Sequence, residues 1–251
     1  MRLINKVAVV TGGSSGIGLA TAQAFKAEGA SVAICGRNQD RLDAAQKQLG
    51  EDAFCQQSDI TRLTDLERFF TTTEARFGKI DVLVANAGEV KFMPMDYFDE
   101  ASFDHVMSNS FKGTFFTIQK ALPYLNNGAS IIVLSATGQS FGFPGSTVAA
   151  ANKAAIRSLS RGISADLLPT RGIRVNCISP GPIATPLFDK LGLPEEQLIG
   201  MKEMFKQQIP LKRMGTAEEV ASTIVFLASD ESSFVIGEEI KVGGGEGNLR
   251  I

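Results

Sequence analysis

A glycine-rich turn between an apolar strand and a helix is the feature that most constrains the fold. The run Thr11-Gly12-Gly13-Ser14-Ser15-Gly16-Ile17-Gly18 follows the apolar segment Val7 to Val10 and opens the amphipathic segment Gly18 to Glu28. Glycines make such a turn tight, and a pyrophosphate can then reach free N–H groups at the positive end of the helix. We therefore predict that a dinucleotide binds at Gly12, Ser14, Ser15, Gly16, Ile17 and Gly18. The alternative is a glycine-rich turn without a ligand.

Strand-like and helix-like segments alternate along the rest of the chain. Further strands are expected at Ser31 to Cys35, Ala53 to Gln57, Val82 to Ala85, Ser130 to Leu134, Arg174 to Ile178 and Glu239 to Val242, and further helices at Gln39 to Leu49 and Leu63 to Phe77. Regular β-α alternation implies parallel strands joined by right-handed helical crossovers. No repeat or linker divides the chain. We predict one α/β domain over residues 1–251, a doubly wound parallel sheet (Rossmann fold) with helices on both faces.

Composition limits the partners. With 251 residues, 44% apolar content and a net charge of −2, the chain has no basic run for nucleic acid or an anionic membrane surface. A small neutral or mildly polar substrate is expected instead. There is no signal-peptide pattern and no apolar run of membrane-spanning length. The three cysteines lie far apart in apolar runs, which favours reduced thiols over a disulfide or metal site and indicates the cytoplasm.

The second predicted strand ends in Ile34-Cys35-Gly36-Arg37. An Asp or Glu at this point would bind the two ribose hydroxyls of NAD, but here there is a cation. A guanidinium can pair with the 2′-phosphate of NADP through charge-assisted hydrogen bonds. The residues therefore favour NADP (NADPH) over NAD, with Arg41 as a second candidate contact. The alternative is that Arg37 is a solvated loop residue.

Together these segments resemble the short-chain dehydrogenase/reductase family, and the resemblance covers essentially the whole chain. Beyond the glycine turn, the resemblance rests on five segments: Asp59-Ile60, Asn86-Ala87-Gly88, Arg174-Val175-Asn176, Pro180-Gly181 with Ile183 and Thr185, and Arg213-Met214-Gly215. The resemblance implies that Asp59 and Ile60 lie near the adenine and that Asn86, Ala87 and Gly88 form a turn at the cofactor. It also implies that Pro180, Gly181, Ile183 and Thr185 lie on the nicotinamide side.

The resemblance also assigns a catalytic tetrad, of which only one member is present. The family's lysine, which binds the nicotinamide ribose, falls on Lys153, and its tyrosine, the proton donor, falls on Ala149. Its serine falls on Ala136 and its asparagine on Ser110, although Ser135 and Asn109 are adjacent. A register shift of one residue would restore the serine and the asparagine, but no shift supplies a tyrosine.

Loss of the tyrosine has a large expected cost. A positioned general acid contributes about 10² to 10⁴ in rate, and hydrogen bonds to a developing oxyanion contribute about 10² to 10³ more. Ordinary ketone reduction should therefore be impaired. Hydride transfer to an acceptor that forms no alkoxide, such as an imine or iminium carbon, does not need the phenol.

Other proton donors are few. Glu89 follows the Asn-Ala-Gly turn and is a candidate acid if burial raises its pKa, although a solvated carboxylate is the simpler interpretation. His105 is the only histidine, and we expect it at the surface or in an interface. Tyr97 and Tyr124 are expected in helical regions away from the nicotinamide. No metal cluster can be assembled from these residues.

Three interpretations remain open. The first is an NADP(H)-dependent oxidoreductase with non-standard chemistry, which the cofactor motifs and Lys153 favour. The second is an inactive member that acts as a cofactor-binding or partner subunit. The third is an engineered variant of an NADP-dependent carbonyl reductase, because Ala136 and Ala149 are what mutagenesis would leave.

An irregular, proline-interrupted region follows the sixth predicted strand. Its apolar side chains suggest a lid over a hydrophobic substrate at residues 182–214, or packing against a neighbouring subunit; they are Leu187, Phe188, Leu191, Met201, Met204 and Phe205. The family resemblance implies a homodimer or homotetramer built through Phe111 to Leu125 and Lys153 to Asp166. Gly243 stands where relatives commonly have Asp before two glycines, which is a departure in that region.

Overall fold

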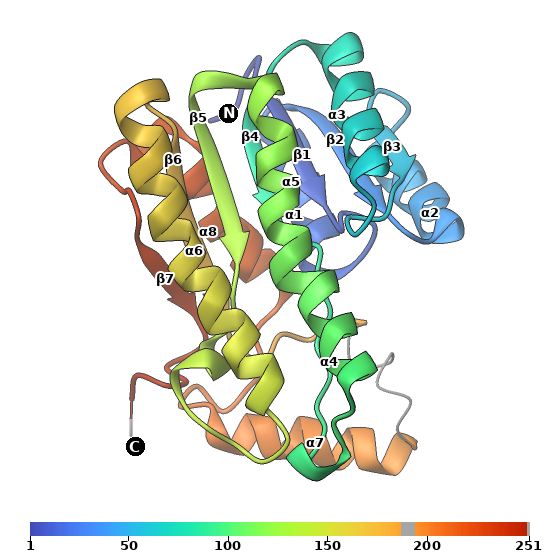
Figure 1. Cartoon of the computed structure of the whole chain (residues 1–251), viewed down its shortest axis with the longest axis vertical. Helices are drawn as coiled ribbons and strands as arrows, with labels where there is room; N and C mark the ends of the chain where they lie inside the picture. Colours follow the sequence, from blue (N-terminus) through green and yellow to red (C-terminus); the bar gives the residue numbers. More distant parts are fainter. Residues whose placement is uncertain (187–193, 250–251) are drawn as a thin grey trace.

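A seven-stranded parallel sheet forms the centre of the computed structural model, which describes residues 1–186 and 194–249 (Figure 1). The strands are β1 (Val7–Thr11), β2 (Ser31–Gly36), β3 (Phe54–Gln57), β4 (Ile80–Ala85), β5 (Leu125–Leu134), β6 (Arg174–Pro180) and β7 (Glu239–Val242). Their order in the sheet is β3-β2-β1-β4-β5-β6-β7. The predicted α/β doubly wound fold is therefore confirmed.

Helices cover both faces of the sheet. They are α1 (Gly16–Ala27), α2 (Gln39–Leu49), α3 (Leu63–Phe77), α4 (Glu100–Met107), α5 (Gly113–Ala121), α6 (Thr147–Arg171), α7 (Glu195–Gln208) and α8 (Ala217–Ala228). A π-helical turn at Ser108–Lys112 joins α4 to α5. On one face α1, α2 and α8 contribute to a hydrophobic cluster, and α3, α5 and α6 contribute to a second cluster on the other.

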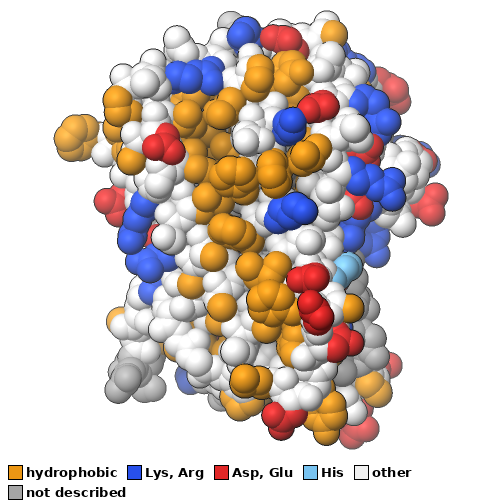
Figure 2. Space-filling model, viewed as in Figure 1, with side chains coloured by type: hydrophobic (Ala, Val, Ile, Leu, Met, Phe, Trp, Pro, Cys, Tyr) orange, Lys and Arg blue, Asp and Glu red, His pale blue; other side chains and the backbone are white. Residues whose placement is uncertain are grey.

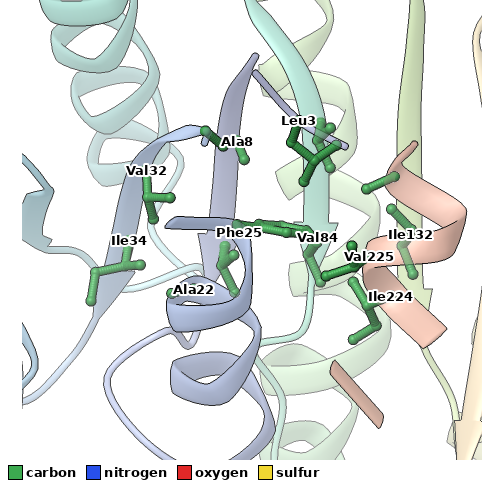
Figure 3. Packing of buried hydrophobic residues seen from close by; sticks show 14 of the residues in the cluster. Leu3, Ala8, Ala22, Phe25, Val32, Ile34, Val84, Ile132, Ile224 and Val225 are labelled. Carbon is green, nitrogen blue, oxygen red and sulfur yellow. The ribbon is translucent and has the colours of Figure 1, made fainter. Parts of the chain in front are cut away.

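Alternation along the strands explains why both faces are covered. Ala8 and Val10 of β1 belong to the cluster that Figure 3 shows, whereas Val7 and Val9 belong to the opposite one. Successive side chains of a strand point to opposite faces, so a strand that is apolar at every position must be buried on both. Phe25 of α1 is fully buried in the first cluster.

The predicted segment boundaries agree closely with the structure, with one substantial difference. Helices α2 and α3 and strand β7 have the predicted bounds, but β5 begins at Leu125 rather than at Ser130. The added residues include Asn126, Asn127 and Gly128, which do not form a strand-like pattern. Leu125 nevertheless pairs with Ile80 of β4 across a register irregularity, and the Asn126 amide donates to Asp81 Oδ1 at 3.0 Å.

The three cysteines are free thiols. Cys35 and Cys177 are buried as expected, but Cys55 on β3 is partly exposed. Burial raises the pKa of Cys35 to about 12 and that of Cys177 to about 11, so both stay protonated at neutral pH. Among residues 1–186 and 194–249, no helix has the length and apolar character to cross a bilayer. Within the same ranges, no group of three or more side chains could hold a metal ion.

Candidate functional site

A cavity of about 640 Å³ opens at the carboxyl ends of the strands. Its walls come from the segments that follow each of the strands β1 to β7, together with α6 and α7. The sheet order reverses direction between β1 and β4, because β2 and β3 lie on one side and β5 to β7 on the other. In doubly wound sheets ligands bind at this switch point, outside the carboxyl ends of the strands.

The turn after β1 requires glycine at two places. Gly12 has a φ of +67°, and a Cβ there would lie 2.9 Å from Asn86 Nδ2. A Cβ on Gly18 would lie 2.3 Å from the Gly12 carbonyl oxygen and 2.6 Å from Asn86 Nδ2. Asn86 holds the turn in place, since its amide donates to the Thr11 and Gly12 carbonyls at 3.0 and 3.2 Å. The predicted Asn-Ala-Gly segment therefore packs directly against the predicted phosphate turn.

The N-terminus of α1 faces the cavity and fits an anionic phosphate. Ser15 is the N-cap residue, but its side chain makes no capping hydrogen bond, and the first turn has no acidic residue. The N–H groups of the first turn are therefore left for an anion at the positive end of the helix dipole. All six residues predicted to bind the phosphates line the cavity: Gly12, Ser14, Ser15, Gly16, Ile17 and Gly18.

Arg37 also lines the cavity, directly after β2, and its guanidinium is held between two partners. It donates to Asn109 Oδ1 at 3.1 Å and to Glu89 Oε2 at 3.3 Å. Glu89 Oε1 lies 3.2 Å from His105 Nε2. Arg37 keeps 55% of its side-chain surface exposed. An incoming phosphate at Arg37 would thus compete with the Glu89 carboxylate.

The remaining predicted cofactor residues line the same cavity with one exception. Ile60, Asn86, Ala87, Gly88, Lys153, Pro180, Gly181, Ile183 and Thr185 all contribute to its wall. Asp59 does not, although its neighbours Ser58 and Ile60 do. Its carboxylate accepts hydrogen bonds from the N–H and the hydroxyl of Thr61 at 2.9 and 2.8 Å.

Lys153 and Ala149 lie one turn apart on α6 and both face the cavity. The Lys153 ammonium donates to the Leu134 carbonyl at 3.0 Å. Burial lowers the pKa of Lys153 to about 8, because an ammonium loses its hydration in this wall. Ala149 is buried and presents only a methyl group. The position beside the lysine therefore offers no hydroxyl.

The other two tetrad positions also offer no free proton donor. Ala136 lines the cavity with a methyl group. The Ser110 hydroxyl donates to the Glu89 carbonyl at 2.9 Å and accepts from the Glu89 N–H at 3.0 Å. The adjacent residues Ser135 and Asn109 both line the cavity, but each is engaged: Ser135 donates its hydroxyl proton to the Lys153 carbonyl, and the Asn109 side-chain oxygen accepts from Arg37. The shift of one residue stays a hypothesis.

The candidate acids from the sequence lie elsewhere. Glu89 does not line the cavity and is held by Arg37 and His105, so its position does not support a role as proton donor. His105 is half exposed, as expected for a surface residue. Tyr97 is 75% exposed, and the Tyr124 hydroxyl lies 2.8 Å from Thr71 Oγ1. Neither of the chain's two tyrosines reaches the cavity.

Sequence reasoning missed a buried carboxyl group in the cavity wall. Glu246 lies after β7 in a glycine-rich turn and is 9% exposed. It is hydrogen-bonded to the Thr137 hydroxyl, although 109 residues separate the two in the chain. Burial raises the pKa of Glu246 above its usual range, against an opposing contribution from Thr137. Locally, Gly243-Gly244-Gly245-Glu246-Gly247 has the pattern of a solvent-exposed turn.

Three aromatic rings form part of the cavity wall. Phe92, Phe141 and Phe143 line it, with ring centroids 5.6 Å apart for Phe92 and Phe143 and 6.0 Å apart for Phe141 and Phe143. Met204 and Phe205 of α7 complete this wall. Part of the predicted lid at 182–214 thus borders the cavity. Leu187, Phe188 and Leu191 lie outside the described residues.

Comparisons with known proteins agree with one another. A family model described as enoyl-(acyl carrier protein) reductase matches residues 12–246. The chain is 45% identical over 246 residues to oxidoreductase asL5 of Sarocladium schorii, covering 97% of this chain and 96% of the relative. It is 38% identical over 251 residues to the 3-oxoacyl-[acyl-carrier-protein] reductase FabG of Thermotoga maritima, covering 98% and 99%.

Solved structures give the same result. A short-chain dehydrogenase/reductase from Brucella melitensis superposes with a TM-score of 0.90 at 34% identity, covering 97% of each chain. Levodione reductase superposes with a TM-score of 0.91 at 31% identity, covering 99% of this chain and 100% of that chain.

Proposed function

Because this chain belongs to the short-chain dehydrogenase/reductase family of oxidoreductases, we propose that it is an NADP(H)-dependent oxidoreductase that works without the usual tyrosine acid. One observation carries the proposal. The same cavity is lined by a glycine turn that suits a dinucleotide and by Ala149, whose side chain is only a methyl group. A bound nicotinamide dinucleotide would supply or accept a hydride in this cavity.

Different residues of the cavity wall would bind different parts of the cofactor. The amides around Ser14 to Ile17 would hold the pyrophosphate, and Arg37 would meet the 2′-phosphate. Lys153 would donate to the nicotinamide ribose, because it lines the cavity and its ammonium has three N–H donors, of which the Leu134 carbonyl takes one. Pro180, Gly181 and Thr185 would border the nicotinamide. Orientation of the acceptor against the ring is then the chief source of rate acceleration.

The acceptor that fits this site forms no alkoxide. Addition of a hydride to a ketone creates an oxyanion, which Ala136 and Ala149 cannot stabilise or protonate. This disfavours the 3-oxoacyl-[acyl-carrier-protein] that appears in the name of the Thermotoga maritima relative. An iminium carbon gives a neutral amine when it accepts a hydride, and an imine does so once its nitrogen is protonated. We therefore place imines, iminium ions and other activated acceptors ahead of simple ketones.

Ligand titration followed by a turnover screen tests this proposal. NADPH and NADP are titrated first, and imines, enones and carbonyl compounds are then assayed for NADPH oxidation in single-turnover experiments. Tight NADPH binding with imine-dependent oxidation is the expected result. Tight binding without turnover of any acceptor would instead identify a cofactor-binding partner subunit. Absence of NADPH binding would contradict both functions.

Cofactor preference should depend on Arg37. Arg37→Leu is expected to weaken NADPH binding about 10-fold to 100-fold and to leave NADH binding nearly unchanged, because a charge-assisted hydrogen bond contributes about 1.5–3 kcal/mol. Glu89→Gln is expected to strengthen NADPH binding several-fold, since the competing carboxylate at 3.3 Å is removed. Isothermal titration of each variant with both cofactors measures these changes.

Arg68→Leu is the matched control for the Arg37 substitution. Arg68 is an exposed arginine of α3 that pairs with Asp65 and does not line the cavity. This variant should keep the wild-type ratio of NADPH to NADH affinity. An unchanged ratio in Arg37→Leu would show that Arg37 does not contact the 2′-phosphate.

We also propose a homodimer or homotetramer. Figure 2 shows hydrophobic side chains gathered in a band over the helices that face the viewer in Figure 1. Helices α4, α5 and α6 carry the exposed residues Phe103, Phe115 and Leu168. Exposed apolar patches of this kind favour subunit contacts. The free thiols of all three cysteines support a cytoplasmic location.

A further inference from the structure

Glu246 is the only carboxyl group on the cavity wall within residues 1–186 and 194–249. The cavity's other ionisable side chains are the cations Arg37, Arg41 and Lys153. Within the same ranges, no Lys, Arg or His side chain forms an ion pair with Glu246. A carboxyl that is 9% exposed and unpaired is costly as an anion, so its presence requires an explanation.

The hydrogen bonds around Thr137 are compatible with a protonated Glu246. The Thr137 hydroxyl lies within hydrogen-bond distance of two acceptors, the Pro180 carbonyl at 3.3 Å and Glu246 Oε2. A hydroxyl has a single proton and can donate to only one of them. If Glu246 is protonated, it donates to Thr137, and Thr137 donates to Pro180. All three groups are then satisfied.

The backbone fixes this carboxyl at the reaction end of the cavity. Gly244, Gly245 and Gly247 have positive φ angles and return the chain towards the sheet after β7. A Cβ on Gly181 would lie 3.1 Å from Glu246 Oε2, and one on Gly243 would lie 2.8 Å from Thr137 Cγ2. Glu246 therefore lies against Pro180-Gly181, the segment that we place beside the nicotinamide.

The surroundings suit a cation that forms during the reaction. The rings of Phe92, Phe141 and Phe143 line the apolar part of the same cavity. Aromatic faces attract organic cations, and a carboxylate nearby adds a full negative charge. A neutral basic imine could enter such a cavity and be protonated there.

From this geometry we propose that Glu246 is the acid of this site, protonating an imine nitrogen and then pairing with the iminium ion. The proposal rests on the function proposed above and names its substrate class, a neutral basic imine beside an apolar or aromatic group. Thr137 is the positioning residue that holds the carboxyl.

The proton and electron balance closes. The O–H bond of Glu246 breaks and an N–H bond forms, which gives an iminium ion and a carboxylate. The iminium carbon then accepts a hydride, with its electron pair, from NADPH. The products are a secondary amine and the oxidised nicotinamide. A proton from solvent restores the carboxyl. The net reaction consumes one imine, one NADPH and one proton.

Glu246→Gln tests the acid directly, because a glutamine side chain has the size and hydrogen-bonding capacity of a protonated glutamate but no acidic proton. We expect kcat/KM for a neutral cyclic imine to fall about 10²-fold to 10⁴-fold, and kcat/KM for its N-methyl iminium ion to fall far less. The acid must be protonated to act, so wild-type kcat/KM for the imine should fall as pH rises through the raised pKa of Glu246. Glu246→Gln should lose that descending limb.

Glu51→Gln is the matched control, since Glu51 is an exposed carboxylate outside the cavity lining. It should keep wild-type kinetics with both substrates. If Glu246→Gln turns over the neutral imine within two-fold of wild type, the function stands and the assignment of Glu246 is overturned. Thr137→Val provides a second variant. It is expected to shift the midpoint of the pH dependence of kcat/KM for the imine, while the iminium ion is still reduced.

A binding experiment without turnover separates the two proposals. Benzyltrimethylammonium, a permanent cation, is compared with its uncharged isostere neopentylbenzene by calorimetry in buffers of different ionisation enthalpy, without cofactor. The wild type should bind the cation more tightly and release up to one proton, and Glu246→Gln should show neither effect. Equal binding of both probes by the wild type overturns the role of Glu246, whether or not any imine is turned over.

Discussion

Tyrosine at position 149 together with serine at position 136 is expected to raise the turnover of a simple ketone by about four orders of magnitude or more. A positioned general acid contributes about 10² to 10⁴, and an oxyanion hydrogen bond about 10² to 10³. Both Ala149 and Ala136 line the cavity, so each new side chain would enter it. Lys153, with its pKa lowered to about 8, would lie one helical turn from the new phenol.

The substitutions are best made stepwise, as Ala149→Tyr, then with Ala136→Ser, then with Ser110→Asn. The third step also breaks the paired hydrogen bonds between Ser110 and the Glu89 backbone, so it is added last. NADPH oxidation with a ketone is measured after each step. Ala149→Phe is the control, because it adds the ring without the hydroxyl and should give no gain. A triple variant that binds NADPH normally and reduces no ketone would show that more than the tetrad has been lost.

Substitution of Gly18 by alanine is expected to weaken NADPH binding by at least 100-fold and to lower stability by about 1–3 kcal/mol. A Cβ there would lie 2.3 Å from the Gly12 carbonyl oxygen, so the phosphate turn must move away from α1. The new methyl would also press on Asn86 at 2.6 Å, the residue that anchors the turn. Fluorescence titration with NADPH and thermal unfolding in the absence of cofactor measure the two effects.

Gly200→Ala provides the opposite control. Gly200 lies within α7, and a Cβ there meets nothing within 4 Å. Alanine in this helical position should raise stability by about 0.5–1 kcal/mol and leave NADPH binding unchanged. If Gly18→Ala bound NADPH as tightly as Gly200→Ala, the turn after β1 would not be the phosphate site.

Local sequence pattern predicted much of the fold because the central strands are buried on both faces. The segments Val7 to Val10 and Glu239 to Val242 are recognisable as short runs with β-branched residues, and α2 and α3 are recognisable by their apolar periodicity. The start of β5 was missed because Asn126 and Asn127 are poor strand formers. Leu125 pairs with Ile80 of β4 and the Asn126 amide donates to Asp81, and no local pattern reveals these contacts.

The candidate site was predictable only where its residues are close in the sequence. The turn from Gly12 to Gly18 is a continuous motif, and the missing tyrosine is visible from its spacing to Lys153. Glu246 was not found, because only the pairing of β7 with β6 brings it against Thr137. Likewise, the contact of Glu89 with Arg37 joins two loops that follow different strands, so the sequence left the carboxylate free to act as an acid.

The division of the cavity wall between distant stretches of chain bears on how its chemistry can evolve. The residues that would hold the phosphates and the adenosine ribose come before position 90, whereas Ala136, Ala149 and Glu246 lie in the second half of the chain. Substitutions at the second group do not disturb the packing of Gly18 against Gly12 and Asn86. A lineage can therefore exchange one proton donor for another while the cofactor requirement is inherited unchanged, and new acceptors become accessible through a few substitutions at one end of the cavity.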